Sequence, residues 1–245
     1  MGLGSSFGIT SETNNNIQTD GLVFYVDAAY KSSYPRSGTT WTDLAGSSNG
    51  TLTNMETDGT DFSSANGGSF TFDGTDDYIE FSYNDVNSYL NGVSQFTWSN
   101  WMKRNASNSK VVIAKGQSLS NDISMEFWSD GNCYVEMGNG SNAYGFFANS
   151  STDWQLLTMV FNGTLTGNSN RLKAYLNGTQ QSLSYGGTIN SVTHTNNGNL
   201  TIGAVEWQGS AHSQGNHGPF LIYNRALTAD EVLQNYNAQK ERFGE

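Results

Sequence analysis

The sequence is poor in cysteine and in basic residues, and each shortage excludes a class of protein. Its single cysteine, Cys133, leaves no internal disulfide and no cysteine-based zinc site. Lysine and arginine number 11 against 22 acidic residues, which gives a formal net charge of -11. A nucleic-acid binder needs a cationic surface to displace counterions from phosphate, and an anionic membrane would repel this chain for the same reason. The sequence therefore predicts no nucleic-acid partner and no membrane partner.

Long apolar runs are also missing. No segment approaches the ~20 apolar residues that span a bilayer. The opening stretch, MGLGSSFGITSETNNN, has neither the basic nor the apolar part of a secretory signal. These absences predict a protein that is made in a cytoplasm and stays soluble. Because residues 1–20 are mostly small and polar, we predict a flexible N-terminal arm there, followed by one domain over residues 21–245.

Glycine, aromatic residues and short apolar runs are what the chain has in quantity. Glycine occurs 28 times but proline only twice, and aromatic and charged residues each make up 13% of the chain. This composition favours β-sheet over helix. Alternating runs recur along the sequence, among them GLVFYVDA, QFTWSNWMKR, WQLLTMVF and NLTIGAVEW. With turn signals roughly every 8–12 residues, they predict an all-β sandwich or barrel.

Two of the turn signals support local predictions. Residues 70–81, FTFDGTDDYIEF, have two alternating runs around an Asp-Gly turn, which predicts a β-hairpin. Asn177 and Gly178 form the pair favoured in tight two-residue hairpins.

The C-terminal tail has the only clear helical pattern. We predict one short helix over about residues 228–240. Thr228 is expected to cap it, with Glu231 completing a capping box. Its apolar stripe would consist of Val232, Leu233 and Tyr236, and would pack on the sandwich.

The order of the segments resembles a known family. FDGTDDYIEF, FTWSNWMKR, WQLLTMVFNGT, LKAYLNGTQ, LTIGA and FLIYNRALTADEV follow one another within about residues 20–240. They look like the concanavalin A-like lectin/glucanase superfamily, and in particular its laminin-G-like jelly roll. The resemblance implies two antiparallel sheets packed face to face, one of them curved. It also implies that most members bind glycans or proteins through rim loops or the concave face. Some would hold calcium, and a minority would hydrolyse polysaccharides.

A hydrolase is the interpretation that the chain supports least. The hydrolases of the family carry Glu-x-Asp-x-x-Glu on one strand, and the nearest stretch here is NDISMEFW. Asp122 and Glu126 share a strand face by parity, but the leading Glu and the intervening Asp are absent. Since glycoside cleavage needs two opposed carboxyl groups, we predict no catalytic residue and no enzymatic activity. The ordinary role for Glu126 is that of a solvated residue on an exposed strand face.

Calcium is the one cofactor that the sequence suggests. Oxygen ligands for it could come from Asp43, Asn49, Asp73, Asp76 and Asp77. The alternative is that these residues only form turns, which Asp favours in any case. In many relatives an acidic pair precedes the IYNRAL motif. Gly218 and Pro219 occupy those positions here, which weakens an inherited calcium site.

Glycan contacts are expected from aromatic and polar residues in loops. EWQGSAHSQGNHG is predicted to be a long polar loop, and NGSNAYGFFANSS a second one. The ligand-contact candidates are Trp207, His212, His217 and Tyr144. The two histidines could also bind a transition metal, but they lack a third ligand. Trp98, Trp154 and Cys133 are predicted to be core residues.

The first functional hypothesis is a noncatalytic virion surface protein of a phage, of the capsid decoration or fibre type. YPRSGTTWTDLAGSSNGTLTN resembles versions of the domain found in bacteriophage structural proteins. The jelly roll would bind surface glycans, the arm would attach to other virion proteins, and the chain could form a homo-oligomer. The alternative is a carbohydrate-binding module of a cell-surface or secreted system, and the third hypothesis is a glycan hydrolase.

Overall fold

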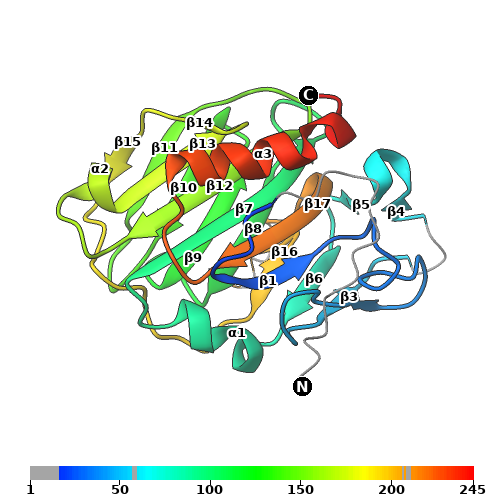
Figure 1. The fold of residues 1–245 in the computed structure, drawn as a ribbon, viewed down its shortest axis with the longest axis horizontal. Coiled ribbons are helices and arrows are strands. Elements are labelled where there is room, and N and C mark those ends of the chain that lie inside the picture. The colour runs from blue at the N-terminus through cyan, green and yellow to red at the C-terminus, as the bar shows by residue number, and fades with distance from the viewer. Residues whose placement is uncertain (1–16, 57–59, 206, 208–210) are drawn as a thin grey trace, which may run out of the picture.

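The computed structural model describes residues 17–56, 60–205, 207 and 211–245, which form two antiparallel sheets packed face to face (Figure 1). Across the eight-stranded sheet the order is β14 (Thr179–Gln180), β13 (Leu172–Leu176), β12 (Gln155–Asn162), β7 (Gln95–Arg104), β17 (Gln214–Tyr223), β5 (Ser69–Asp73) and β4 (Phe62–Ser63), with β1 (Leu22–Val26) paired to β17 beside β5. Across the nine-stranded sheet the order is β15 (Ser184–Gly186), β11 (Tyr144–Ala148), β10 (Asn132–Met137), β9 (Asp122–Phe127), β8 (Val111–Gly116), β16 (Leu200–Ile202), β6 (Tyr78–Phe81), β3 (Gly50–Thr53) and β2 (Thr40–Trp41). The predicted two-sheet antiparallel sandwich is confirmed.

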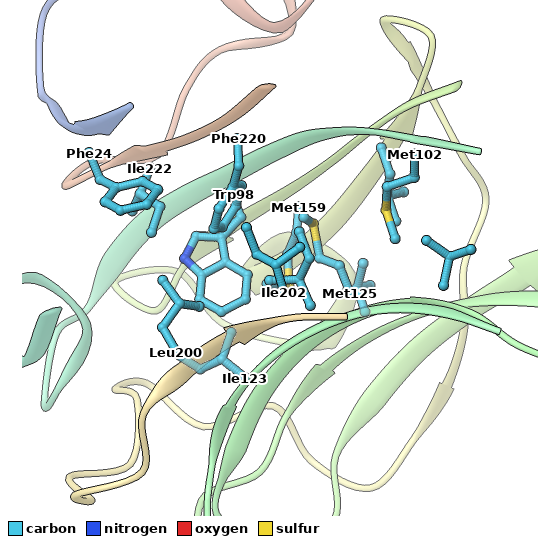
Figure 2. Close-up of a cluster of buried hydrophobic side chains, with 14 of the residues drawn as sticks. Phe24, Trp98, Met102, Ile123, Met125, Met159, Leu200, Ile202, Phe220 and Ile222 are labelled. Atoms are coloured by element: carbon cyan, nitrogen blue, oxygen red, sulfur yellow. The ribbon is translucent and has the colours of Figure 1, made fainter. Parts of the chain in front are cut away.

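The core lies between the two sheets because each strand turns alternate side chains inward (Figure 2). Trp98 from β7 and Phe220 from β17 meet edge to face, with ring centroids 5.5 Å apart. Met125 and Ile202 approach them from the opposite sheet. Trp98 is fully buried in this core, as predicted. Trp154, which is 9% exposed, is buried instead in a separate cluster with Trp101 and Phe243.

Residues 70–81 do not form the predicted hairpin. β5 pairs with β17 and β4 in one sheet, whereas β6 pairs with β16 and β3 in the other. The Asp-Gly turn therefore carries the chain across the sandwich. Phe72 and Ile79 are both fully buried and face the core from opposite layers. A hairpin and a crossing turn place the same apolar residues on the inner side, so alternation alone does not separate them.

The hairpin at Asn177 is confirmed. β13 and β14 pair with Leu176 opposite Thr179, which leaves two residues in the loop. Asn177 has φ 49 and Gly178 has φ 77, the left-handed values that a type I′ turn requires at both positions.

Helix α3 (Ala229–Phe243) covers the outer face of the eight-stranded sheet (Figure 1). The predicted capping box is present: the Thr228 side chain accepts from the Glu231 N–H, and the Glu231 side chain accepts from the Thr228 N–H. Phe243 stacks on Trp101 with ring centroids 4.1 Å apart. The apolar stripe differs from the prediction, because Leu233 is 43% exposed.

Two shorter helices were not predicted, α1 (Tyr83–Leu90) and α2 (Asn168–Arg171), and a single 3-10 turn spans Ala65–Gly67. None of the described helices combines the length and the apolar character needed to cross a bilayer. Most of the predicted arm, residues 1–16, lies outside the described residues. Gln18 is bound to α3 through its backbone N–H, which donates to Asn235 Oδ1 at 2.8 Å, so the arm would end before this residue.

Candidate functional site on the outer face of the nine-stranded sheet

Three acidic residues lie on the side of the nine-stranded sheet that faces away from the core. On β9, Ile123 and Met125 point into the core, so Asp122 and Glu126 point outward, as the parity argument predicted. Strand β10 pairs with β9 so that Tyr134 lies opposite Glu126 and Glu136 lies opposite Ser124. Glu136 was missed in the sequence, because only the register of β10 brings it beside the other two.

Aromatic side chains from β10 and β11 adjoin the acids. Tyr144 lies opposite Glu136, and Phe146 lies opposite Tyr134. Tyr134 stacks on Phe146 with centroids 5.4 Å apart, and its ring meets Tyr144 edge to face at 5.8 Å. All three rings are half-buried. We call this surface the acid–aromatic face; it consists of Asp122, Glu126, Glu136, Tyr134, Tyr144 and Phe146.

The three carboxyl groups are largely withdrawn from water. Asp122, Glu126 and Glu136 are 2%, 7% and 8% exposed. A side-chain hydrogen bond joins the carboxyl groups of Asp122 and Glu136, so one of them carries the shared proton. Within the described part of the chain, Oδ2 of Asp122 and Oε2 of Glu136 have no other partner. Buried polar atoms are nearly always paired, so an acid pair that is satisfied only by a shared proton is unusual.

Burial also sets the protonation of these groups. Burial, together with the neighbouring carboxyl groups, raises the pKa of Asp122 to about 8 and that of Glu136 to about 9. Burial raises the pKa of Glu126 to about 7, although the Ser124 hydroxyl donates to Glu126 Oε1 at 2.6 Å and acts in the opposite direction. Near neutral pH, burial therefore favours the protonated form of Asp122 and Glu136.

Two glycines make room for the Asp122 side chain. A Cβ at Gly138 would lie 2.5 Å from Asp122 Oδ1, and one at Gly116 would lie 2.7 Å from Asp122 Cβ. The Gly138 N–H donates to the same oxygen at 3.2 Å. Larger residues at either position would displace the carboxyl group.

Trp207 adjoins the acids from the other side. It is half-buried and packs against a cluster that includes Val112, whose strand position is directly opposite Glu126. The indole N–H of Trp207 has no partner among the described atoms. Trp207 and Tyr144, the two aromatic contacts predicted from the sequence, thus lie on one sheet face with the carboxyl groups between them.

The two candidate histidines are separated. His212 is half-buried and forms an isolated bridge with Ala204 near Trp207. His217 is on β17 and fully buried, so the prediction of a loop residue that contacts ligand is wrong. Its ring nitrogens contact Asn100 Oδ1 at 2.9 Å and Ser213 Oγ at 3.2 Å. Burial lowers the pKa of His217 to about 3, which keeps it neutral.

Gly218 and Pro219 belong to the same strand. The register of β17 against β7 shifts between His217 and Phe220, and the Asn100 amide donates to the carbonyls of Gly218 and Pro219 at 3.1 and 2.8 Å. Proline is tolerated within this sheet because it sits at an irregularity that needs no N–H donor.

The predicted calcium ligands fall into two groups. Asp73, Asp76 and Asp77 bring carboxylate oxygens within 4.8 Å of one another, the one such trio among the described residues. Asp73 Oδ1 accepts from the Thr75 N–H at 2.7 Å, and Asp77 Oδ2 accepts from the Asp73 N–H at 3.0 Å, so both residues also shape the turn. Burial, with neighbouring acids, raises the pKa of Asp77 to about 6.

Asp43 and Asn49 have a structural role. Asp43 accepts backbone N–H bonds from Tyr25, Ala45 and Ser48 at 2.9–3.2 Å, and its own N–H donates to Asn49 Oδ1 at 3.0 Å. The two residues fold their loop against β1 and do not join the acidic trio at the turn.

The geometry has the form of a lectin-like sandwich, and the comparison with protein families agrees with it. Residues 72–233 match the family model described as the concanavalin A-like lectin/glucanases superfamily. The chain belongs to this superfamily. None of the curated proteins compared with the chain matches it.

Solved structures of the superfamily fold are similar in shape but distant in sequence. Domain 4 of a GH43 extracellular arabinanase from Geobacillus stearothermophilus, in complex with arabinotriose, has a TM-score of 0.63 at 18% identity over 89% of this chain and 100% of that one. The receptor binding domain of botulinum neurotoxin C/D mosaic serotype gives 0.65 at 12% identity, over 89% of this chain. A Trypanosoma rangeli sialidase gives 0.63 at 13% identity, over 94% of this chain. The chain spans 51% of the toxin structure and 34% of the sialidase. At these identities the likeness concerns the fold.

Proposed function

We propose that the chain is a noncatalytic glycan-binding domain and that the acid–aromatic face is its binding surface. One observation supports this more than any other: half-buried aromatic rings adjoin carboxyl groups whose oxygens have no partner within the described structure apart from the hydrogen bond between Asp122 and Glu136. Sugars stack their apolar faces on such rings and donate hydroxyl hydrogens to such oxygens. A related sandwich was solved in complex with arabinotriose, which is consistent with the proposal.

Replacing Tyr144 by alanine is expected to weaken glycan binding about tenfold, because stacking on an aromatic ring contributes roughly 1.4 kcal/mol. A glycan array would identify a ligand, and calorimetry would give its affinity for both proteins. The matched control is Tyr83→Ala at the start of α1, which should leave the affinity unchanged. Equal affinities of wild type and Tyr144→Ala would show that the binding surface lies elsewhere on the domain.

The carboxyl groups support the noncatalytic part of the proposal. A glycosidase needs one protonated and one ionised carboxyl group across the scissile bond. Here burial raises the pKa of all three acids, and Glu126, at about 7, is only partly ionised at neutral pH. The leading Glu and the intervening Asp of the hydrolase motif, which would supply the opposed pair, are absent. We expect no release of reducing ends from any glycan that the protein binds. Release that Glu126→Gln abolishes would establish a hydrolase instead.

We also propose a setting for this domain, the surface of a phage virion. The support is the resemblance of residues 34–54 to versions of the domain in bacteriophage structural proteins. A carbohydrate-binding module of a cell-surface or secreted system is the alternative. Gold-labelled antibody against the chain should decorate purified virions, and particles that never label would favour the alternative.

A further inference from the structure

We propose that the acid–aromatic face selects glycans that carry free amino groups, such as oligomers of glucosamine, over neutral and acidic glycans. The inference rests on the proposed glycan-binding function and adds the chemical class of the ligand. It starts from Asp122 and Glu136, which are 2% and 8% exposed and whose carboxyl groups hydrogen-bond to each other. Within the described structure, Asp122 Oδ2 and Glu136 Oε2 have no other hydrogen-bond partner.

An ammonium group matches these oxygens better than a hydroxyl group does. It offers three N–H donors and a full positive charge, whereas a hydroxyl offers a single donor. Hydrogen bonds between charged partners are about twice as strong as neutral ones. An acidic sugar would instead raise the cost of ionising these carboxyl groups, and it cannot supply the positive charge that an ammonium group brings.

The protein supplies little positive charge of its own to this face. The positive charge of Lys110 lowers the pKa of Glu126. The Lys110 ammonium group itself lies over the Trp128 ring, with Nζ 4.3 Å from the ring centre. Among the described residues, no cation acts on Glu136. A cationic ligand would therefore replace the protons that burial keeps on these carboxyl groups, and the face would become charged as the ligand binds. The chain's net charge of -11 favours the approach of such a ligand.

A metal ion fits the face less well than an amino sugar. Calcium needs oxygen ligands that converge on one point. Within the described residues only Asp73, Asp76 and Asp77 bring three such atoms within 4.8 Å, so the acids on the face are more widely spread. An amino sugar is large enough to contact acids that are separated in this way. Its ring can stack on Tyr144 while its ammonium group reaches Glu136, which lies directly opposite Tyr144 in the strand pair.

The experiment compares two ligands that differ only at the nitrogen. Calorimetry at pH 6.5 would measure a glucosamine oligomer and its N-acetylated counterpart of equal length. We expect the free amine to bind at least about tenfold more tightly. Equal affinities, or a preference for the acetylated oligomer, would overturn the inference and leave the proposed function intact. If neither oligomer nor any array glycan binds, the proposed function itself fails.

Variants separate the site from general charge attraction. Glu136→Gln and Asp122→Asn keep the shape of each side chain and should remove the preference for the free amine, while binding of the acetylated oligomer persists. Glu241→Gln removes the same charge from the exposed side of α3, on the opposite sheet, and should leave the preference unchanged. If all three variants reduce the preference equally, the attraction belongs to the acidic chain as a whole and the inference is wrong.

Discussion

Arg242→Met is expected to lower the free energy of unfolding by about 3–5 kcal/mol, the usual effect of removing one partner of a buried ion pair. Arg242 holds Asp27 through two nitrogens, at 2.7 and 2.8 Å, and the Asp27 side chain is only 1% exposed. Arg242 also donates to the backbone carbonyls of Asn66 and Gly68. The variant would leave a buried carboxylate without its counterion and would detach the end of α3 from the N-terminal part of the domain.

Urea denaturation followed by tryptophan fluorescence would measure this loss. Lys240→Met is the matched control, since it removes a positive charge two residues away whose contact is the Tyr236 ring, 5.6 Å from the ammonium nitrogen. We expect the control to cost less than about 1 kcal/mol. Similar losses in the two variants would show that the pair with Asp27 contributes no more than an exposed charge.

The same pair shows what local sequence patterns predict and what they leave open. The capping box at Thr228 and Glu231 was predictable, because both residues act within one turn of helix. The contact between Arg242 and Asp27 joins residues 215 positions apart and has no local signature. The turn at residues 73–77 is a similar case: its Asp and Gly residues specify a bend, whereas the pairing partners of β5 and β6 decide which sheet each strand enters.

For the candidate site, the sequence predicted which residues of one strand share a face, but not which residues of other strands lie beside them. Parity placed Asp122 and Glu126 on one face, but their near-complete burial depends on residues that other strands bring beside them. Glu136 joins them through strand register, and Trp207 by packing beside Val112 and Ala114 of β8. His217 was misplaced because GNHG has the composition of a loop, although tertiary pairing with β7 makes it a central strand.

The double variant Asp122→Asn with Glu136→Gln is expected to be about 3 kcal/mol more stable than wild type at pH 9. Burial and the neighbouring carboxyl groups raise the pKa of Asp122 from 3.8 to about 8 and that of Glu136 from 4.5 to about 9. At 1.36 kcal/mol per pKa unit, half of the pKa rise at Asp122 alone accounts for this figure. The other half of that free energy is not expected to appear in the measurement, because the ionised side chains can move partly into water. Neutral amides need no such hydration, and the amide introduced by Asp122→Asn would keep an oxygen that accepts from the Gly138 N–H.

The pH dependence follows from proton linkage. When the pKa of an acid is higher in the folded state, the folded state binds more protons, so the stability present below pH 4 is lost as the pH rises from there through about 8 and 9. The advantage of the double variant should therefore vanish near pH 4 and grow steadily toward pH 9. Glu241→Gln, an exposed acid on α3, should match wild type at every pH.

Urea titrations at pH 4, 7 and 9 would measure this divergence. An advantage that is constant across the three pH values would mean that packing, and not the charging of the two acids, separates the variant from wild type. If the variant gains stability at high pH and also loses its preference for amino glycans, then the same two carboxyl groups destabilise the free domain and select its ligand. Binding sites commonly carry such a conflict, because groups poised for a ligand are poorly satisfied without it. A ligand that supplies the missing cation should accordingly stabilise the wild type more than the variant, at a pH where the amino group of the ligand still carries its proton.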